Sequence, residues 1–138
     1  MILIDTGPIV AFFDKDDRCH SLCLEVLKKI RHPLVTTWPV ITECFYLLNF
    51  SWEVQESLWG YIQRGGVEIY PLDREMEIRC RDLMKQYRNL PMDLADATLV
   101  AVGEKIEAST VFTLDHKDFS IYRLKHKKGF KLLPTRIS

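Results

Sequence analysis

Four acidic residues that lie far apart in the sequence carry the chemistry expected of this chain. Carboxylates held close together oppose one another's ionisation, so a cluster of them needs a compensating cation. Oxygen ligands of this kind favour Mg²⁺ or Mn²⁺, and such ions act on phosphate groups. The residue types therefore predict metal-assisted hydrolysis of a phosphodiester bond. The four residues are Asp5, Glu43, Asp96 and Asp115.

Two of these acids directly follow expected strands. Asp5 comes after the apolar run Ile2–Ile4, and Asp115 lies two residues beyond the run Thr110–Thr113. The carboxyl ends of the strands in an open parallel sheet share one edge, where ligands bind. We therefore expect these carboxylates to meet at that edge.

The other two acids lie early in apolar helical patterns. Glu43 stands about one turn into a helix expected after Pro39, among apolar neighbours. Asp96 lies in the first turn of a helix that is apolar on almost all sides, with Asp93 as its expected N-cap. Such a helix is typical of the middle of a protein, where a charge needs a partner. No Lys or Arg stands one helical turn from Asp5, Glu43 or Asp96.

Several of these acids also have structural explanations. Asp5 and Asp93 each stand where a helix N-cap is expected. Asp115 and Asp118 lie in a polar stretch that is typical of turns. Both explanations remain open for each residue, and only their joint placement favours a metal site.

Short apolar runs alternate with longer helical patterns along the chain. Strands separated by helices of this length pair in parallel, with the helices packed on the sheet. The fold class is therefore predicted to be α/β. Pro8 and Pro39 are expected at the first helical position after the first two strands. The expected strands are Ile2–Ile4, Leu34–Thr37, Val67–Tyr70, Thr110–Thr113 and Phe130–Leu133.

The composition, with 47% hydrophobic and 28% charged residues, is that of one globular domain over residues 1–138. No apolar run reaches the roughly 18–20 residues of a membrane span. No basic stretch precedes the apolar start of the chain, so we expect no signal peptide and a cytoplasmic protein. The cysteines have no zinc-binding spacing, and we expect reduced, mostly buried thiols. They are Cys19, Cys23, Cys44 and Cys80.

The net charge of zero hides an uneven distribution. Residues 1–118 contain all 19 acidic residues and 13 of the 19 basic ones, whereas residues 119–138 contain six basic residues and no acid. This basic segment either guides a polyanion toward the carboxylates or is an ordinary solvated surface.

The chain resembles the PIN domains in four short motifs that occur in the same order. The resemblance spans Asp5 to about Phe119, and a chain of this length is similar to the VapC-type toxins of bacterial and archaeal toxin–antitoxin pairs. It implies an α/β/α sandwich, endoribonuclease activity dependent on Mg²⁺ or Mn²⁺, homodimers, and inhibition by a cognate antitoxin. The motifs are Ile4-Asp5-Thr6-Gly7-Pro8, Thr42-Glu43, Met92 to Ala97, and Thr113 to Phe119.

The four acids match the family's acidic quartet position by position. The resemblance suggests that Asp5 and Asp96 hold the metal, with Glu43 and Asp115 contributing directly or through water. In-line attack of water on phosphorus would leave a 5′-phosphate and a 3′-hydroxyl. Gly103 departs from the usual alanine, which we expect to loosen packing there. Accessory acids and hydroxyls match at Asp93, Asp118, Thr6 and Thr113.

Three other functions would explain part of this pattern. A haloacid-dehalogenase-type enzyme requires a second Asp where this chain has Gly7. A receiver-like phosphoacceptor domain requires an acid pair near the first strand and a late lysine, for which Lys131 is only a loose match. The serious alternative is a non-catalytic module with the PIN fold that binds RNA or a protein.

Overall fold

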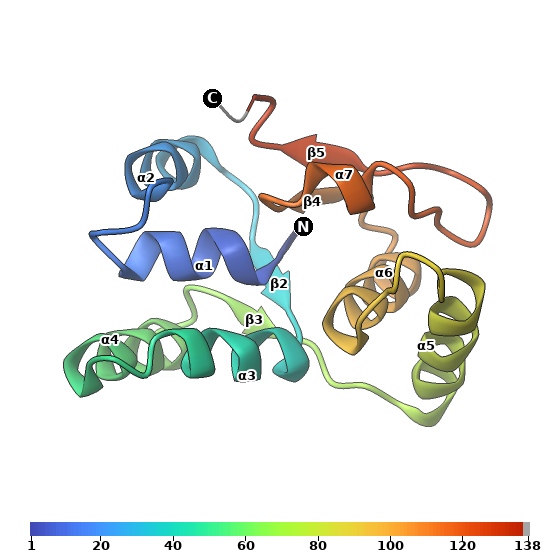
Figure 1. Cartoon of the computed structure of the whole chain (residues 1–138), viewed down its shortest axis with the longest axis horizontal. Helices are drawn as coiled ribbons and strands as arrows, with labels where there is room; N and C mark the ends of the chain where they lie inside the picture. Colours follow the sequence, from blue (N-terminus) through green and yellow to red (C-terminus); the bar gives the residue numbers. More distant parts are fainter. Residues whose placement is uncertain (137–138) are drawn as a thin grey trace.

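A five-stranded parallel sheet forms the centre of the computed structural model, which describes residues 1–136 (Figure 1). The strand order is β3-β2-β1-β4-β5, so β1 lies in the middle. The last two residues of the expected domain, 137–138, lie outside the described residues. The strands are β1 (Ile2–Ile4), β2 (Leu34–Thr36), β3 (Glu68–Ile69), β4 (Thr110–Phe112) and β5 (Lys131–Leu133).

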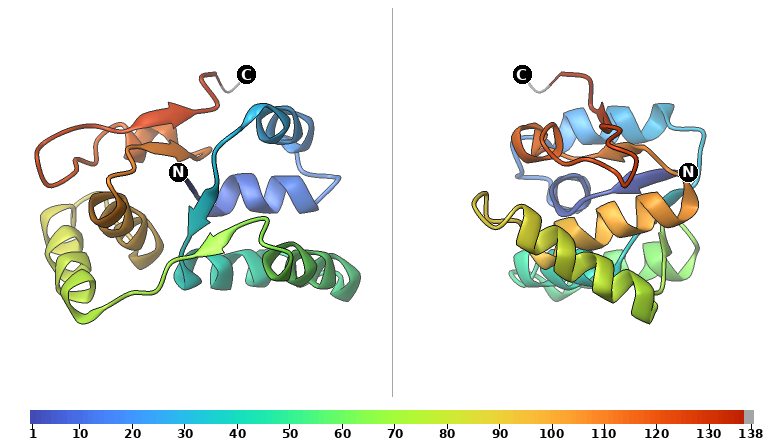
Figure 2. Two further views of the ribbon diagram at one scale, coloured as in Figure 1. Left: turned by 180° about the vertical axis from the view of Figure 1, so that it is seen from behind. Right: turned by 90° about the vertical axis from the view of Figure 1, so that its right-hand side faces the viewer.

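Helices cover both faces of this sheet. The chain passes from β1 through β2 to β3 in one direction, and then crosses back past β1 to β4. Figures 1 and 2 show α1 to α4 on one side of the sheet and α5 and α6 on the other. The predicted α/β/α sandwich is confirmed. The helices are α1 (Thr6–Phe13), α2 (His20–Lys29), α3 (Trp38–Leu47), α4 (Trp52–Gln63), α5 (Arg74–Gln86), α6 (Leu94–Ile106) and α7 (His116–Phe119).

Two helices begin earlier than the prolines predicted. Helix α1 begins at Thr6, so Pro8 is its third residue, and Pro39 is the second residue of α3. The prediction of proline at the first position was wrong by one or two residues. The reason is that the first four N–H groups of a helix have no intrahelical partner, so proline is tolerated throughout the first turn.

Helix α6 is the most deeply buried helix among the described residues. Nine consecutive side chains, residues 95–103, are buried where α6 packs against α5, α3 and β1. A Cβ atom at Gly103 would lie 2.8 Å from the Ala108 carbonyl oxygen and 3.0 Å from Leu3 Cδ1. The expectation that glycine loosens packing here was wrong, because its missing side chain allows the close approach of neighbouring atoms.

Two simpler expectations concern the thiols and the membrane. All four cysteines are free, and three of them, Cys23, Cys44 and Cys80, are buried, as predicted. Within residues 1–136, no helix has both the length and the apolar character needed to cross a membrane.

Candidate active site

Asp5 lies at the carboxyl end of the central strand β1. Its backbone N–H still belongs to the sheet and donates to the Phe112 carbonyl oxygen at 2.9 Å. The residue occupies the N-cap position of α1, but its side chain makes no capping hydrogen bond. Its Oδ2 instead accepts a hydrogen bond from the Thr113 hydroxyl at 2.8 Å. The structural explanation of Asp5 as a side-chain cap therefore does not hold.

The Asp5 carboxylate is buried, with 7% of its residue surface exposed. Burial raises the pKa of Asp5 to about 6, and the charges of Glu43 and Asp93 raise it further, whereas the Thr113 hydrogen bond lowers it. Glu43 and Asp93, which belong to two other parts of the fold, therefore act electrostatically on Asp5.

Asp96 is the second buried acid, at 9% exposure in the first turn of α6. Its backbone N–H donates to Asp93 Oδ1 at 2.8 Å, which confirms Asp93 as the N-cap of this helix. Burial raises the pKa of Asp96 to about 8; the charge of Asp5 is the next largest cause, and those of Asp93 and Asp115 add to it. The Tyr122 hydroxyl opposes these effects by donating to Asp96 Oδ2 at 2.7 Å.

Glu43 reaches the same region from α3. Its Oε1 accepts a hydrogen bond from the Thr6 hydroxyl at 2.6 Å, which ties α3 to the first residue of α1. Glu43 is exposed to solvent, although its neighbours Ile41 and Cys44 are fully buried. The predicted convergence of Glu43 with Asp5 is supported by the effect of its charge on the Asp5 pKa.

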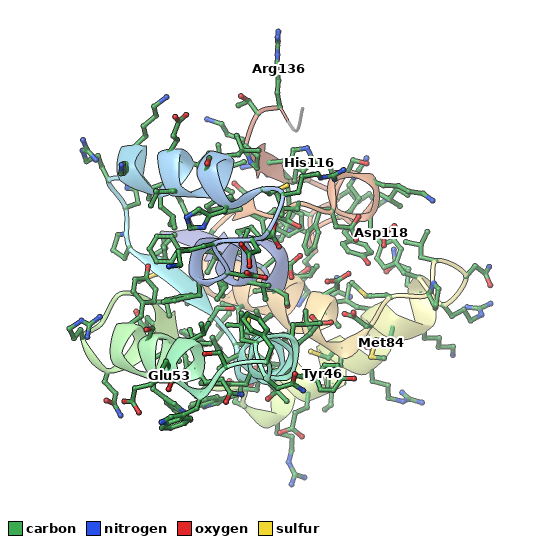
Figure 3. All side chains as sticks on the ribbon, turned by 60° about the vertical axis from the view of Figure 1, so that its left-hand side comes forward. Tyr46, Glu53, Met84, His116, Asp118 and Arg136 are labelled. Atoms are coloured by element: carbon green, nitrogen blue, oxygen red, sulfur yellow. The ribbon has the colours of Figure 1, made fainter. Side chains whose placement is uncertain are left out.

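Asp115 and Asp118 approach Asp96 from the short helix α7. The three residues each offer a carboxylate oxygen within 4.8 Å of the other two. Asp115 is exposed and caps α7 by accepting the Asp118 backbone N–H at 3.0 Å. Figure 3 labels Asp118 on this helix. The turn expected here from the sequence is therefore a helical turn that presents both acids.

Two hydroxyls predicted near the site lie beside the acids. Thr113 donates to Asp5 and also accepts the backbone N–H of Asp115 at 3.0 Å. Thr6 donates to Glu43. Sequence reasoning missed the third hydroxyl, that of Tyr122, because no spacing in the sequence connects it with Asp96.

The acids of this site have no cationic partner among the described residues. Within residues 1–136 the ion pairs lie elsewhere: Arg79–Glu104, Arg81–Asp82 and Lys105–Asp73. Neutral hydroxyls and backbone N–H groups hold the site acids in place without compensating their charge. Such an arrangement favours a bound cation.

Part of the basic segment lies away from these acids. Lys125 and Lys128 line a cavity with Glu104 and Glu107 at the C-terminal end of α6, whereas Asp96 lies at its N-terminal end. The Arg123 guanidinium instead donates to the carbonyl oxygens of residues 120–122. The structure therefore favours the solvated-surface explanation for this part of the chain.

Comparisons with known proteins agree with this architecture. A family model for the PIN domain matches residues 2–125. Ribonuclease VapC26 of Mycobacterium tuberculosis is 24% identical over 143 residues, which cover 96% of this chain and 100% of that protein.

Two solved structures share the fold at 18% identity. The Mycobacterium tuberculosis toxin VapC20, which cleaves the sarcin-ricin loop, superposes with a TM-score of 0.74 over 85% of this chain and 92% of its own. VapBC2 from Rickettsia felis, bound to a DNA fragment from its promoter, gives a TM-score of 0.63 over 96% and 97%.

Proposed function

This chain belongs to the PIN domain family, and we propose that it is a divalent-metal-dependent endoribonuclease that acts as the toxin of a toxin–antitoxin pair. The observation that carries the proposal is the group of acids from β1, α3, α6 and α7 that no cationic side chain neutralises. The similarity of this chain to Ribonuclease VapC26 supports RNA as the substrate.

The residues present fit a hard divalent cation. The donors are carboxylates, and no nitrogen or sulfur ligand takes part in the group formed by Asp96, Asp115 and Asp118. All-oxygen donor sets suit Mg²⁺ and Mn²⁺. Burial, together with the charges of neighbouring acids, raises the pKa values of Asp5 and Asp96, and a bound cation would stabilise both carboxylates in their ionised form.

The proposed roles follow from how each acid is held. Asp5 and Asp96 are buried and fixed by hydroxyl donors, so we assign them as the principal ligands. Glu43 and Asp115 are exposed and contribute directly or through water. When bound, the cation supplies electrostatic stabilisation of phosphate oxygens and activation of water for hydrolysis.

The remaining groups of the site orient its carboxylates and add negative charge around them. Thr6 and Thr113 fix the carboxylates of Glu43 and Asp5. Asp93 and Asp118 add negative charge at the N-terminal ends of α6 and α7, where the helix dipole favours it. Glu43 and Asp115 are exposed, so the site is open to solvent on their side, and a bound cation would offset their charge for an RNA phosphate to approach.

Cleavage of single-stranded RNA tests the proposal directly. The purified chain is titrated with Mg²⁺ or Mn²⁺, and the products are resolved with and without a chelator. We expect cleavage that requires the cation and stops on chelation. RNA binding without cleavage at any metal concentration would instead identify the non-catalytic module.

A protein partner is supported by exposed aromatic side chains on the α3–α4 hairpin. Ten large hydrophobic side chains are exposed in the described part of the chain, and six of them lie on or between these two helices. Contiguous exposed apolar surface of this kind marks protein interaction sites, in which Trp and Tyr dominate the binding energy. We call this surface the aromatic face: Trp38, Tyr46, Leu47, Phe50, Trp52 and Trp59.

The charge around the aromatic face selects the kind of partner. Residues 33–63 contain no Lys or Arg but include Glu43, Glu53 and Glu56. Figure 3 labels Tyr46 and Glu53 in this part of the molecule. An acidic surface repels RNA and favours an antitoxin segment that carries apolar and basic side chains. Tyr46 lies one helical turn from Glu43, so a partner bound here would also cover the edge of the site.

Co-expression with the product of an adjacent reading frame tests the antitoxin. We expect a complex that withstands purification and inhibits cleavage. The double variant Phe50→Ser, Trp52→Ser should lose the complex but keep its cleavage activity. A complex that is unaffected by both substitutions would show that the partner does not bind through the aromatic face.

The proposal also includes a homodimer. Sedimentation velocity of the full chain at micromolar concentration measures its oligomeric state. A single species with the mass of two chains is expected, and a monomer at every concentration would remove the dimer from the proposal.

A further inference from the structure

The Tyr122 hydroxyl has been described above only as a donor to Asp96, without a role of its own. It donates to Asp96 Oδ2 at 2.7 Å, and the Tyr122 side chain is fully buried. Asp96 is thereby held at two points, since Asp93 also accepts its backbone N–H. The other side chains whose charges act on Asp96 are acids: Asp5, Asp93 and Asp115.

The Tyr122 ring is fixed on two sides. Phe119 and Tyr87 each lie with ring centroids 5.1 Å from it, in edge-to-face orientations. The Tyr87 hydroxyl accepts the backbone N–H of Arg123, which joins the neighbouring ring to the same turn. Because aromatic rings packed in this way have little freedom, the direction of the Tyr122 hydroxyl is determined before any ligand binds.

The backbone that carries Tyr122 is fixed as well. The Arg123 guanidinium donates to the carbonyl oxygens of residues 120, 121 and 122 at 2.7, 3.1 and 2.9 Å. The basic side chain nearest in sequence to Tyr122 is therefore bound to this turn, and Asp96 receives its hydrogen bond from a neutral group.

A neutral donor has a specific consequence for Asp96. A phenol is protonated at neutral pH, and the Tyr122 hydroxyl donates its proton to Asp96 Oδ2 at 2.7 Å. A lysine or arginine at this point would neutralise Asp96 and compete with a cation. The phenol instead occupies one carboxylate oxygen and leaves the negative charge, with Oδ1, available.

We propose that Tyr122 is a positioning residue that orients the Asp96 carboxylate for the divalent cation. The inference rests on the proposed function, because it requires that this site bind a metal. Donors that orient a ligand in this way typically affect metal affinity by roughly 10–100-fold.

Direct metal binding by the full chain tests this role without relying on activity. Mn²⁺ is titrated by calorimetry into the wild type, Tyr122→Phe and Tyr87→Phe. Tyr122→Phe keeps the ring and removes only the hydroxyl; Tyr87→Phe removes a hydroxyl from the same aromatic cluster that does not touch an acid. We expect Mn²⁺ affinity to fall about tenfold in Tyr122→Phe and much less in Tyr87→Phe, because the Tyr87 hydroxyl contacts only the backbone N–H of Arg123.

The possible outcomes distinguish a failure of this inference from a failure of the proposed function. If the wild type binds Mn²⁺ and Tyr122→Phe binds it equally well, Tyr122 does not position Asp96 and the proposed function stands. An equal loss in both variants would assign the effect to ring packing, which also overturns the inference. A wild type that binds no Mn²⁺ would overturn the proposed function, and the inference with it.

A measurement on the wild type covers the case in which Tyr122→Phe fails to fold. The chain has five tyrosines, so Tyr122 can be assigned by elimination from Phe variants of the other four. With tyrosine labelled by ¹³C at Cζ, Mg²⁺ should shift the resonance of Tyr122 but not that of Tyr46, which is exposed on α3. No response of the Tyr122 resonance at saturating Mg²⁺ would overturn the inference.

Discussion

Two acids near opposite ends of α6 differ in the charge of the groups that surround them. Near its C-terminal end, Glu104 accepts two hydrogen bonds from the Arg79 guanidinium, at 2.8 and 2.9 Å. At the N-terminal end, Asp96 accepts one hydrogen bond from a neutral phenol and lies among other carboxylates. The two residues are about 12 Å apart along the helix axis.

This difference separates a structural acid, Glu104, from Asp96, the acid that we propose to be functional. Arg79 balances the charge of Glu104 within the protein, and the pair joins α5 to α6. The charge of Asp96 is left without a balancing cation among the described residues, which costs stability unless a cation binds. A protein keeps such an arrangement where function requires it.

The largest expected effect comes from removing the charge at the site. Asp96→Asn should lower the rate of RNA cleavage by about 10³-fold, since several kcal/mol of metal-dependent stabilisation are lost. Above pH 8, where Asp96 is ionised in the metal-free chain, the metal-free variant should also melt at a higher temperature than the wild type, because a repelled buried charge is gone. Cleavage kinetics and thermal melts measure both effects.

Glu104→Gln is the matched control on the same helix. It removes an acid of α6 that lies outside the site, so cleavage should remain near the wild-type rate. Equal loss of cleavage in both variants would contradict the distinction between the two ends of α6.

Stability should depend on pH in a direction set by the raised pKa values. Asp5 and Asp96 have pKa values of about 6 and about 8 in the folded chain, against 3.8 for an ordinary Asp side chain. The folded state therefore holds more protons than the unfolded state in this range, and its stability falls as pH rises from about 4 through about 8. Urea unfolding of the metal-free chain at pH 5 and pH 8 measures this loss.

Two further measurements sharpen the pH prediction. Mg²⁺ should raise stability more at pH 8 than at pH 5, since the ion binds the ionised carboxylates. Asp96→Asn should flatten the dependence on pH, and Glu104→Gln should leave it in place. A metal-free chain that becomes more stable from pH 5 to pH 8 would contradict the uncompensated charge of the site.

A smaller effect is expected at the paired end of α6. Glu104→Gln should lower the free energy of unfolding by about 1–2 kcal/mol, because Arg79 loses a charged hydrogen-bond partner and remains partly buried. Its Mn²⁺ affinity should equal that of the wild type. Chemical unfolding and calorimetry of the same preparation check both values, and a weakened affinity would show that the two ends are coupled.

The smallest effect is expected from the basic segment near the C-terminal end of α6. Replacing Lys125, Lys127 and Lys128 by Gln should change cleavage of a short RNA by less than about twofold and leave the salt dependence of binding nearly unchanged. Cleavage rates across a series of salt concentrations measure this. A markedly shallower salt dependence in the variant would show that the basic segment contacts RNA.

The sequence by itself determined the class of fold and pointed to the acids that we propose as the principal ligands. Apolar runs separated by helical patterns require a parallel sheet with crossover helices, and Asp5 directly follows such a run. The apolar character of residues 94–102 likewise predicted that α6 lies in the middle of the molecule. These features could be predicted because local periodicity and the edge of a parallel sheet determine them.

Only the tertiary structure decided which donors hold the acids. Tyr122 is 26 residues from Asp96, and Thr113 is 108 residues from Asp5; packing brings each pair within hydrogen-bond distance. It also decided that Lys125 and Lys128 lie at the far end of α6, whereas their charge alone left open whether they lie beside the acids. Side-chain contacts of this kind depend on how distant elements pack, and no local pattern in the sequence records that packing.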